Sequence, residues 1–320
     1  MEAGYRLVTY AGAGEKPVAG VIVADRVHAA SVLLGGEELT VLDILRRWGD
    51  LDPRLAQAAA AAPRSAGKAL SDIRLLAPIQ YPGVLFCAGA NYWDHLAEMG
   101  ELVKKMTGSA PSMVKAAEPW FFIKTTAGTI VGDGARVRLP SFSQKVDWEA
   151  ELGVVIGWPT RNISEADAFE CVAGYVIVND LSARDFVKRE GSPFIYDWIG
   201  QKCWDGAGPM GPWLTPAAYV KDPNNLAIRL SVNGVTKQSS NTAQMVHGIA
   251  EQIAYLSRHV TLQPGDVIAT GTPSGVGMPR GEFLKVGDEV RVEIEGLGTL
   301  TNVMVADDAT SWSGREAANG

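Results

Sequence analysis

Residues 147–156 read Asp-Trp-Glu-Ala-Glu-Leu-Gly-Val-Val-Ile and join alternating carboxylates to an apolar run. In a β-strand, residues two apart point to the same face, so Glu149 and Glu151 would lie side by side at about 6.5–7 Å. A solvated polar face would explain this alternation by itself. The apolar run favours a buried strand instead, and a buried strand holds two like charges only where a cation or a proton compensates them. The stretch therefore predicts a strand that carries a charged site.

A second carboxylate ends another apolar run, because residues 174–180 read Gly-Tyr-Val-Ile-Val-Asn-Asp and finish at Asp180. A turn or cap role would explain this aspartate if it stood alone. Three carboxylates without neighbouring Cys or His are hard oxygen ligands, which suit Mg²⁺, Mn²⁺ or Ca²⁺. Asp147 shares the strand face of the two glutamates, so spacing alone leaves open which carboxylates would bind.

Basic and imidazole side chains occur near these segments. Arg184 could bind a substrate carboxylate with its forked guanidinium, and Lys202 could polarise a carbonyl, although either could be a surface cation. His95 and Glu98 are three residues apart, so they would touch on a helix, where the carboxylate would orient the imidazole as a general base. A capped helix start with an exposed histidine is the alternative. The other histidines, His28, His247 and His259, are interpreted as structural.

Composition narrows the class of protein. The 320 residues are 47% apolar and 20% charged, as in ordinary globular proteins, and the net charge of −7 offers no basic surface for nucleic acid. No apolar run is long enough to span a membrane. The three cysteines lack ligand spacing and indicate a reducing, cytoplasmic setting. The phosphate-binding and GxSxG nucleophile motifs are also absent from the sequence.

The order of patterns predicts a β-rich α+β fold in two parts. We expect a small N-terminal α+β domain over residues 1–76 with a helix at 40–48, a catalytic domain over 77–306 with a helix at about 242–259, and a flexible tail over 307–320. Residues 100–118 lack clear periodicity and are predicted to form a long loop that acts as a mobile lid. The expected strands are 5–10, 20–23, 84–88, 120–124, 148–156, 175–178, 226–232, 266–270, 289–295 and 299–305.

Six motifs in order resemble the fumarylacetoacetate hydrolase family over about residues 80–305. They are residues 89–98 with His95 and Glu98, 121–124, 147–157, 179–185, 209–213 and 265–277. The resemblance implies a mixed β-roll catalytic domain and a homodimer.

The resemblance also implies the roles of individual residues. A divalent metal, Mg²⁺ or Mn²⁺ with Ca²⁺ as a third option, would be held by Glu149, Glu151 and Asp180. A lid would carry His95 and Glu98, which with Lys202 form the expected catalytic set. Substrate would contact Arg184, Thr272 and Tyr92. The chain departs from the family pattern at Val187, where a glutamine is frequent.

The expected activity is metal-dependent hydrolysis of a C–C bond in an acylpyruvate-like 1,3-diketo or 2-oxo acid, in the catabolism of aromatic or related compounds. His95, oriented by Glu98, would activate the water that attacks the distal carbonyl. Decarboxylation of a 2-oxo acid and 2-hydroxymuconate-type isomerisation are alternatives on the same site. A catalytically silent ligand-binding relative is the alternative of another class, and the fold alone does not choose between them.

Overall fold

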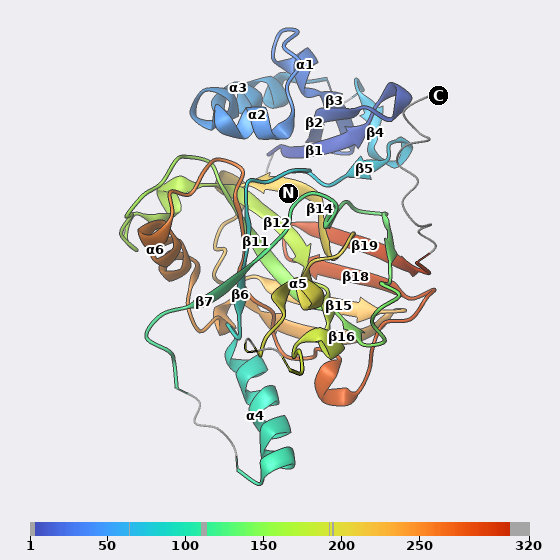
Figure 1. The fold of residues 1–320 in the computed structure, drawn as a ribbon. Coiled ribbons are helices and arrows are strands. Elements are labelled where there is room, and N and C mark those ends of the chain that lie inside the picture. The colour runs from blue at the N-terminus through green and yellow to red at the C-terminus, as the bar shows by residue number, and fades with distance from the viewer. Residues whose placement is uncertain (1–3, 64, 110–113, 192, 194, 308–320) are drawn as a thin grey trace.

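The computed structural model describes residues 4–63, 65–109, 114–191, 193 and 195–307. Figure 1 shows a strand-rich body with an N-terminal layer above it and helix α4 projecting below. The main sheet has the order β4-β3-β2-β1-β14-β12-β11-β17-β6-β7, with β5 beside β1 and β8 beside β14. Its strands are β1 Arg6–Ala11, β2 Pro17–Val23, β3 Arg26–Ala29, β4 Lys68–Ala69, β5 Leu75–Leu76, β6 Leu85–Gly89, β7 Trp120–Lys124, β8 Ile130–Val131, β11 Ala150–Ile156, β12 Val172–Asn179, β14 Gly208–Pro216 and β17 Val267–Ala269.

A five-stranded sheet packs beside the main sheet in the order β16-β15-β18-β19-β9. Its strands are β9 Arg136–Arg138, β15 Ala227–Val232, β16 Val235–Asn241, β18 Glu289–Ile294 and β19 Gly298–Val305, and a small ladder joins β10 Val146–Asp147 to β13 Ser182–Ala183. The α-helices are α1 Ala30–Leu33, α2 Val41–Arg46, α3 Trp48–Ala61, α4 Trp93–Thr107, α5 Trp198–Lys202 and α6 Ile249–His259. Short 3-10 turns cover Ala13–Glu15, Leu70–Asp72, Ala168–Cys171, Arg184–Phe186, Ala217–Tyr219, Thr242–Gln244 and Met278–Arg280.

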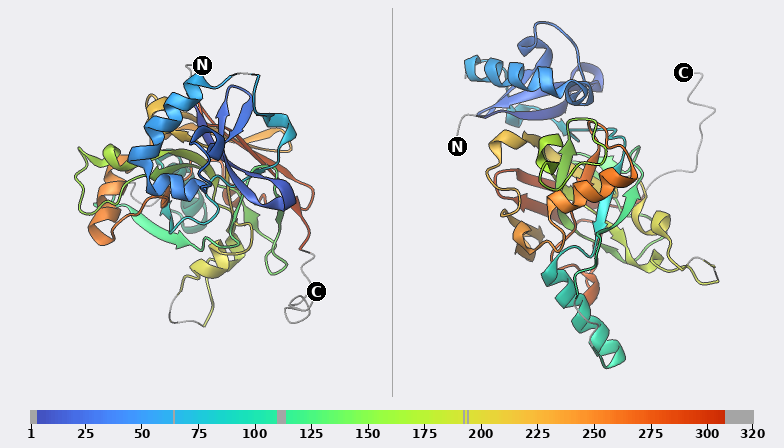
Figure 2. Two further views of the ribbon diagram at one scale, coloured as in Figure 1. Left: turned by 90° about the horizontal axis from the view of Figure 1, so that it is seen from above. Right: turned by 90° about the vertical axis from the view of Figure 1, so that its left-hand side faces the viewer.

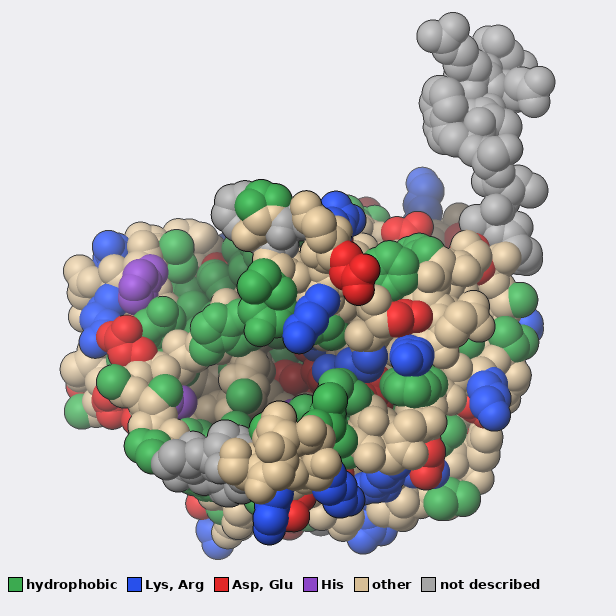
Figure 3. Space-filling view, turned by 60° about the horizontal axis from the view of Figure 1, so that its bottom comes forward, with side chains coloured by type: hydrophobic (Ala, Val, Ile, Leu, Met, Phe, Trp, Pro, Cys, Tyr) green, Lys and Arg blue, Asp and Glu red, His purple; other side chains and the backbone are tan. Residues whose placement is uncertain are grey.

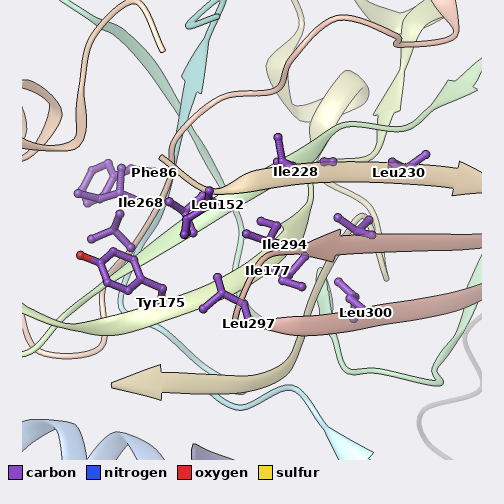
Figure 4. Close-up of a cluster of buried hydrophobic side chains, with 14 of the residues drawn as sticks. Phe86, Leu152, Tyr175, Ile177, Ile228, Leu230, Ile268, Ile294, Leu297 and Leu300 are labelled. Atoms are coloured by element: carbon purple, nitrogen blue, oxygen red, sulfur yellow. The ribbon is translucent and has the colours of Figure 1, made fainter. Parts of the chain in front are cut away.

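The core between the two sheets is built from both inner faces. Figure 4 shows Leu152 and Ile177 of the main sheet packed against Ile228, Leu230 and Ile294 of the five-stranded sheet. The five-stranded sheet covers the face of β11 that carries Leu152 and Val154, and a second hydrophobic cluster covers the opposite face at Val155, so every residue of β11 is buried. This burial fixes the position of the carboxylates at the beginning of that strand.

The N-terminal segment is joined to the main sheet by backbone pairing. Strand β1 pairs antiparallel with β14, with Leu7 opposite Leu214. Helices α2 and α3 lie across this part of the molecule (Figure 2), and Ile44 and Trp48 share a hydrophobic cluster with Val176 of β12. The division of the chain at residue 76 stays a prediction. Apart from Asp307, the expected tail lies outside the described residues.

Helix α4 overturns part of the expected loop over residues 100–118. The helix continues through Gly100, which is buried, to Thr107, and it ends at Gly108, whose φ of 84° is left-handed. Residues 101–107 read Glu-Leu-Val-Lys-Lys-Met-Thr and are mostly good helix formers. Leu96, Met99, Val103 and Met106 recur at helical spacing along α4, so the sequence contains an apolar stripe that the expectation of a loop overlooked.

Other helix boundaries also differ from the expectation. The helix predicted over residues 40–48 is two helices. Thr40 and Asp43 form a capping box at the start of α2, which ends at Arg46, and α3 begins at Trp48. The helix predicted over about 242–259 begins as a 3-10 turn and becomes α-helical only from Ile249. None of the helices in the described part of the chain is long and apolar enough to cross a membrane.

Candidate active site

The three carboxylates expected at a metal site lie together where two neighbouring strands meet. Strands β11 and β12 are antiparallel with Ala150 opposite Asn179, which places Asp180 beside the start of β11. The backbone N–H of Asp180 donates to the carbonyl of Glu149 at 2.9 Å. Glu149, Glu151 and Asp180 are all buried, and each offers one carboxylate oxygen within 4.8 Å of the others. The structure therefore brings together the set that sequence spacing alone left open.

Asp147 has a different place from these three. One of its oxygens accepts from the N–H groups of Trp148 at 2.8 Å and Gly277 at 2.6 Å, and the other accepts from the N–H of Met278 at 3.0 Å. Its Oδ2 also lies 2.9 Å from Nε of Arg184. Asp147 therefore holds the loop at residues 277–278, and its oxygens are already occupied.

Two expected cationic residues contact the carboxylate cluster. Lys202 Nζ lies 2.8 Å from Glu149 Oε2 and 2.6 Å from Asp180 Oδ2, while Arg184 Nη2 lies 2.6 Å from Glu149 Oε1. Burial raises the pKa of Glu149, but the charges of Lys202 and Arg184 outweigh it and lower that pKa to about 2. Glu149 is therefore ionised at neutral pH.

Glu151 has the opposite electrostatic setting. Burial, followed by the charges of Asp180 and Glu149, raises its pKa well above the usual value. One oxygen, Oε2, accepts a hydrogen bond from the N–H of Gly271 at 2.8 Å. A positive charge among the three carboxylates would favour the ionised form of Glu151.

Lys124 is a buried contact of Asp180 that sequence analysis assigned to a motif without giving it a role. Its Nζ lies 2.8 Å from Asp180 Oδ1 and donates to the backbone carbonyls of Leu181, Lys202 and Ala207 at 3.0, 2.6 and 2.9 Å. These three carbonyls use all three ammonium protons, so the lysine acts on Asp180 through charge. A lysine at the end of the apolar run Trp-Phe-Phe-Ile was the signal available in the sequence.

The donor set fits a divalent cation. Asp180 Oδ1 is buried, and no hydrogen-bond donor reaches it from the described residues. When Glu151 is ionised, four carboxylates, with Asp147 included, face three cations, and the remaining negative charge is available to a bound ion. Oxygen ligands of this kind suit Mg²⁺ or Mn²⁺. Glu149, Glu151 and Asp180 would hold the ion.

The His95–Glu98 pair lies on the first turns of α4. His95 Nδ1 is 3.7 Å from Glu98 Oε2, which is longer than a hydrogen bond. Glu98 Oε2 accepts instead from the N–H of Gly275 at 2.9 Å. Burial raises the pKa of Glu98, but neighbouring His95 and the Gly275 amide lower it more. The carboxylate is thus ionised and lies next to the imidazole without a hydrogen bond to it.

Residues 271–275 connect this pair to the carboxylate cluster. The loop donates from Gly271 to Glu151 at one end and from Gly275 to Glu98 at the other. The N–H of Ser274 also donates to Asp94 of α4 at 3.2 Å. Thr272, expected to contact substrate, is buried between these anchors.

Tyr92 lies immediately before α4 and is fully buried. Its hydroxyl has no hydrogen-bond partner within the described residues. Burial raises its pKa, and the charges of Glu151 and Asp94 add to this effect. A neutral hydroxyl in this position could donate to a bound anion.

Aromatic side chains stand next to the cluster. The Phe122 ring lies 4.9 Å from Lys202 Nζ and stacks on Trp198 at a centroid distance of 5.6 Å. Trp120 lies 4.8 Å from Trp198 and is 47% exposed. Figure 3 shows a hollow on this side of the molecule, with charged side chains of both signs at its floor and hydrophobic ones along its edge.

The comparison with known families matches this arrangement. Residues 84–305 match the model for the C-terminal region of fumarylacetoacetate hydrolase. The chain belongs to the fumarylacetoacetate hydrolase family. The matched range contains both sheets' central strands, the carboxylate cluster and the His95–Glu98 pair, so the resemblance seen in the sequence is confirmed.

Relatives in this family differ in the reaction that their names describe. The mitochondrial oxaloacetate tautomerase fahd2 of Xenopus laevis is 45% identical over 238 residues, which cover 73% of this chain and 69% of that protein. The fumarylacetoacetate hydrolase of Exiguobacterium antarcticum is 30% identical, with a TM-score of 0.77 over 95% of this chain and 100% of that one. The maleylpyruvate hydrolase of Sphingobium sp. SYK-6, solved with manganese(II) and pyruvate, is 27% identical, with a TM-score of 0.74 over 95% and 100%. The similarity to these two solved structures confirms the expected β-rich α+β fold.

Proposed function

We propose that this chain is a divalent-metal-dependent enzyme that enolises a small anionic 2-oxo acid. The observation that carries the proposal is the loop at residues 271–275, which fixes the carboxylate cluster at one end and the His95–Glu98 pair at the other. Enolisation needs a cation near the 2-oxo oxygen and a base near the adjacent carbon. The loop at residues 271–275 would hold the two groups that meet these requirements.

Each group would have a defined task. The cation, Mg²⁺ or Mn²⁺, would be held by Glu149, Glu151 and Asp180, and when bound it would supply positive charge to the carboxylate and 2-oxo oxygens of the substrate. Lys202 would stay protonated, because its contacts with Asp180 and Glu149 outweigh burial and raise its pKa. Its charge would add to the attraction of an anion.

The His95–Glu98 pair would move the proton. His95 would take a proton from the carbon next to the 2-oxo group and return one to carbon or oxygen, while ionised Glu98 would stabilise the imidazolium. For an oxaloacetate-like acid this gives keto–enol tautomerisation with no bond to carbon broken except C–H. The 45% identical tautomerase from Xenopus supports this outcome.

Hydrolysis of an acylpyruvate is the second candidate, and the structural similarity to maleylpyruvate hydrolase favours it. Here His95 would take a proton from water, whose oxygen bonds to the distal carbonyl carbon. The C–C bond would then break, and its electron pair would leave with the pyruvate part as an enolate. Protonation of that carbon gives pyruvate, and the distal part leaves as a carboxylate. The homodimer and the cytoplasmic location stay predictions.

Two assays on the Mg²⁺-loaded protein separate these reactions. Enol oxaloacetate should lose its ultraviolet absorbance faster with enzyme than without, with no cleavage product. With acetylpyruvate in H₂¹⁸O, a hydrolase would give pyruvate and singly labelled acetate. The His95→Ala variant should lose most of its activity, and His259→Ala, which changes an exposed histidine on α6, should keep it. If metal binds tightly and no 2-oxo acid reacts, the chain is a silent relative and the proposal is wrong.

A further inference from the structure

Gln238 is a buried amide on β16 that reaches the loop at residues 271–275, and neither the motifs nor the proposed reaction uses it. Its Oε1 accepts from the N–H of Ala150 at 2.9 Å. Its Nε2 donates to Thr272 Oγ1 and to the carbonyl of Pro273, both at 2.9 Å. The side chain is 0% exposed, so all of these bonds are shielded from water.

The partners of Gln238 fix which way round its amide sits. The N–H of Ala150 can only donate, and the carbonyl of Pro273 can only accept, so exchanging the amide oxygen and nitrogen would break both bonds. Nε2 must therefore face Thr272. An amide nitrogen can only donate, so the hydroxyl of Thr272 accepts from it.

This direction leaves the hydroxyl proton of Thr272 available. Thr272 is 5% exposed, and within the described part of the chain Oγ1 makes no hydrogen bond besides the one from Gln238. A buried O–H without an acceptor is costly, and such groups in proteins usually have a partner or a function. The next residue back, Gly271, donates to Glu151, so the proton lies at the border of the carboxylate cluster.

We propose that Gln238 is a positioning residue that makes Thr272 a hydrogen-bond donor to an oxygen of the bound 2-oxo acid. An anionic 2-oxo acid presents only acceptors on its carboxylate and carbonyl. A threonine hydroxyl that donated to an acceptor in its own loop would present only lone pairs to this anion and repel it. The inference rests on the proposed function for the identity of the ligand.

A purely structural role for Gln238 would also explain its burial, since the amide ties β16 to β11 and to Pro273. The two explanations differ in what they predict for ligand affinity. If Gln238 has only a structural role, its replacement lowers stability, and the protein that remains folded binds the ligand as tightly as the wild type does. A positioning role lowers ligand affinity in the folded protein and makes Thr272 and Gln238 act as one unit.

The test measures oxalate binding to the Mg²⁺-loaded full chain by calorimetry, in Thr272→Val, Gln238→Met and the double variant. We expect each single variant to weaken oxalate binding by about 10- to 100-fold, the range for a hydrogen bond to a charged oxygen. The double variant should be no weaker than Thr272→Val alone. Magnesium affinity should change little, because neither side chain is among the three carboxylates.

Asn302→Leu is the matched control. Asn302 is a buried amide in the same five-stranded sheet and donates to two backbone carbonyls, those of Gly132 and Ala135, at 2.9 and 3.0 Å. Its loss should lower stability without changing oxalate affinity. Gln238→Glu is a second variant of nearly native size. Its added carboxylate oxygen would accept the Thr272 proton, so we expect it to weaken oxalate binding as well.

The outcomes separate this inference from the proposed function. Unchanged oxalate affinity in folded Gln238→Met, or additive losses in the double variant, would overturn the positioning role. If the wild-type protein binds oxalate with the predicted pattern and turns over no 2-oxo acid, the proposed function fails and the role of Gln238 stands. If the Mg²⁺-loaded wild type binds no oxalate, both are wrong.

Discussion

The ammonium of Lys124 lies 2.8 Å from Oδ1 of Asp180, and both side chains are buried. The same lysine donates to the backbone carbonyl of Lys202, whose own ammonium contacts Asp180 from the other side. Lys124 therefore holds in place both a candidate metal ligand and the backbone of a candidate catalytic residue. Its position in the interior makes it a supporting residue of the site, with no contact to solvent.

Lys124→Met should lower stability and raise metal affinity, because Asp180 is left with a negative charge that a bound cation would balance. Removing one partner of a buried ion pair costs about 3–5 kcal/mol, because the remaining charge is left uncompensated. Urea unfolding and magnesium titration would measure the two effects. Lys115→Met is the control, because the Lys115–Glu251 pair is partly exposed and such a pair contributes about 0–1 kcal/mol. Equal losses of stability in the two variants would contradict a special role for Lys124.

His95→Ala should reduce kcat by about 10²- to 10⁴-fold, the usual contribution of a positioned general base. Glu98→Gln should reduce it less, because the amide can still accept from Gly275 and the imidazole is retained. Metal affinity should be unchanged in both variants, since neither residue belongs to the three-carboxylate cluster. Wild-type turnover by His95→Ala would exclude the pair from the reaction.

Glu98 should contribute to stability in a pH-dependent way. Although burial raises its pKa, His95 and the Gly275 amide lower it below the value in the unfolded chain. The stabilisation is therefore present above about pH 4.5, the unfolded pKa, and is lost as pH falls through the lower folded pKa. In urea unfolding between about pH 6 and pH 3, Glu98→Gln should lose less stability than wild type, with the difference appearing below about pH 5. Glu118→Gln, at an exposed ion pair with Arg258, should follow wild type.

Metal affinity should fall as pH decreases. Burial, with the charges of Asp180 and Glu149, raises the pKa of Glu151, so a proton competes with the cation for this carboxylate. Calorimetric titration of Mg²⁺ in buffers of different ionisation enthalpy should reveal proton release. Chelation should abolish turnover, and Mg²⁺ or Mn²⁺ should restore it. Full turnover by protein shown to be metal-free by elemental analysis would refute the three-carboxylate site.

Hydrogen exchange should divide helix α4 into two parts. Asp94 and Glu98 accept hydrogen bonds from Ser274 and Gly275, so residues 93–100 are held on the loop even without ligand. Residues 104–107 are exposed and should exchange fast. A lid that moves as a whole would instead show fast exchange along the entire helix and slowing on addition of oxalate with Mg²⁺.

The sequence predicted those parts of the site whose chemistry is local. The alternation at Glu149 and Glu151 and the strand end at Asp180 are visible as patterns, and so is the spacing of His95 and Glu98. It did not predict β14, because three prolines and two glycines within nine residues are unfavourable for a strand and are tolerated here through tertiary contacts.

Contacts between residues that are far apart in the chain could not be predicted from the sequence either. Lys124 is 56 positions from Asp180, and Gln238 is 34 from Thr272, so their roles depend on how the sheets pack. The polar strand β16, Val-Thr-Lys-Gln-Ser-Ser-Asn, has no apolar alternation to reveal it. What it contributes to the site is a single amide, whose importance is evident only from its three partners.

The antiparallel pairing of β1 with β14 has a consequence for any shortened form of this protein. A chain beginning at residue 77 would keep the range matched by the family, yet it would leave one edge of β14 without its neighbour and uncover Leu214 and Val176. An open strand edge beside apolar side chains invites pairing with other molecules. The N-terminal segment thus covers an edge that would otherwise be open to self-association. Its removal should first appear as aggregation during expression, before any change in the catalytic activity of the folded protein.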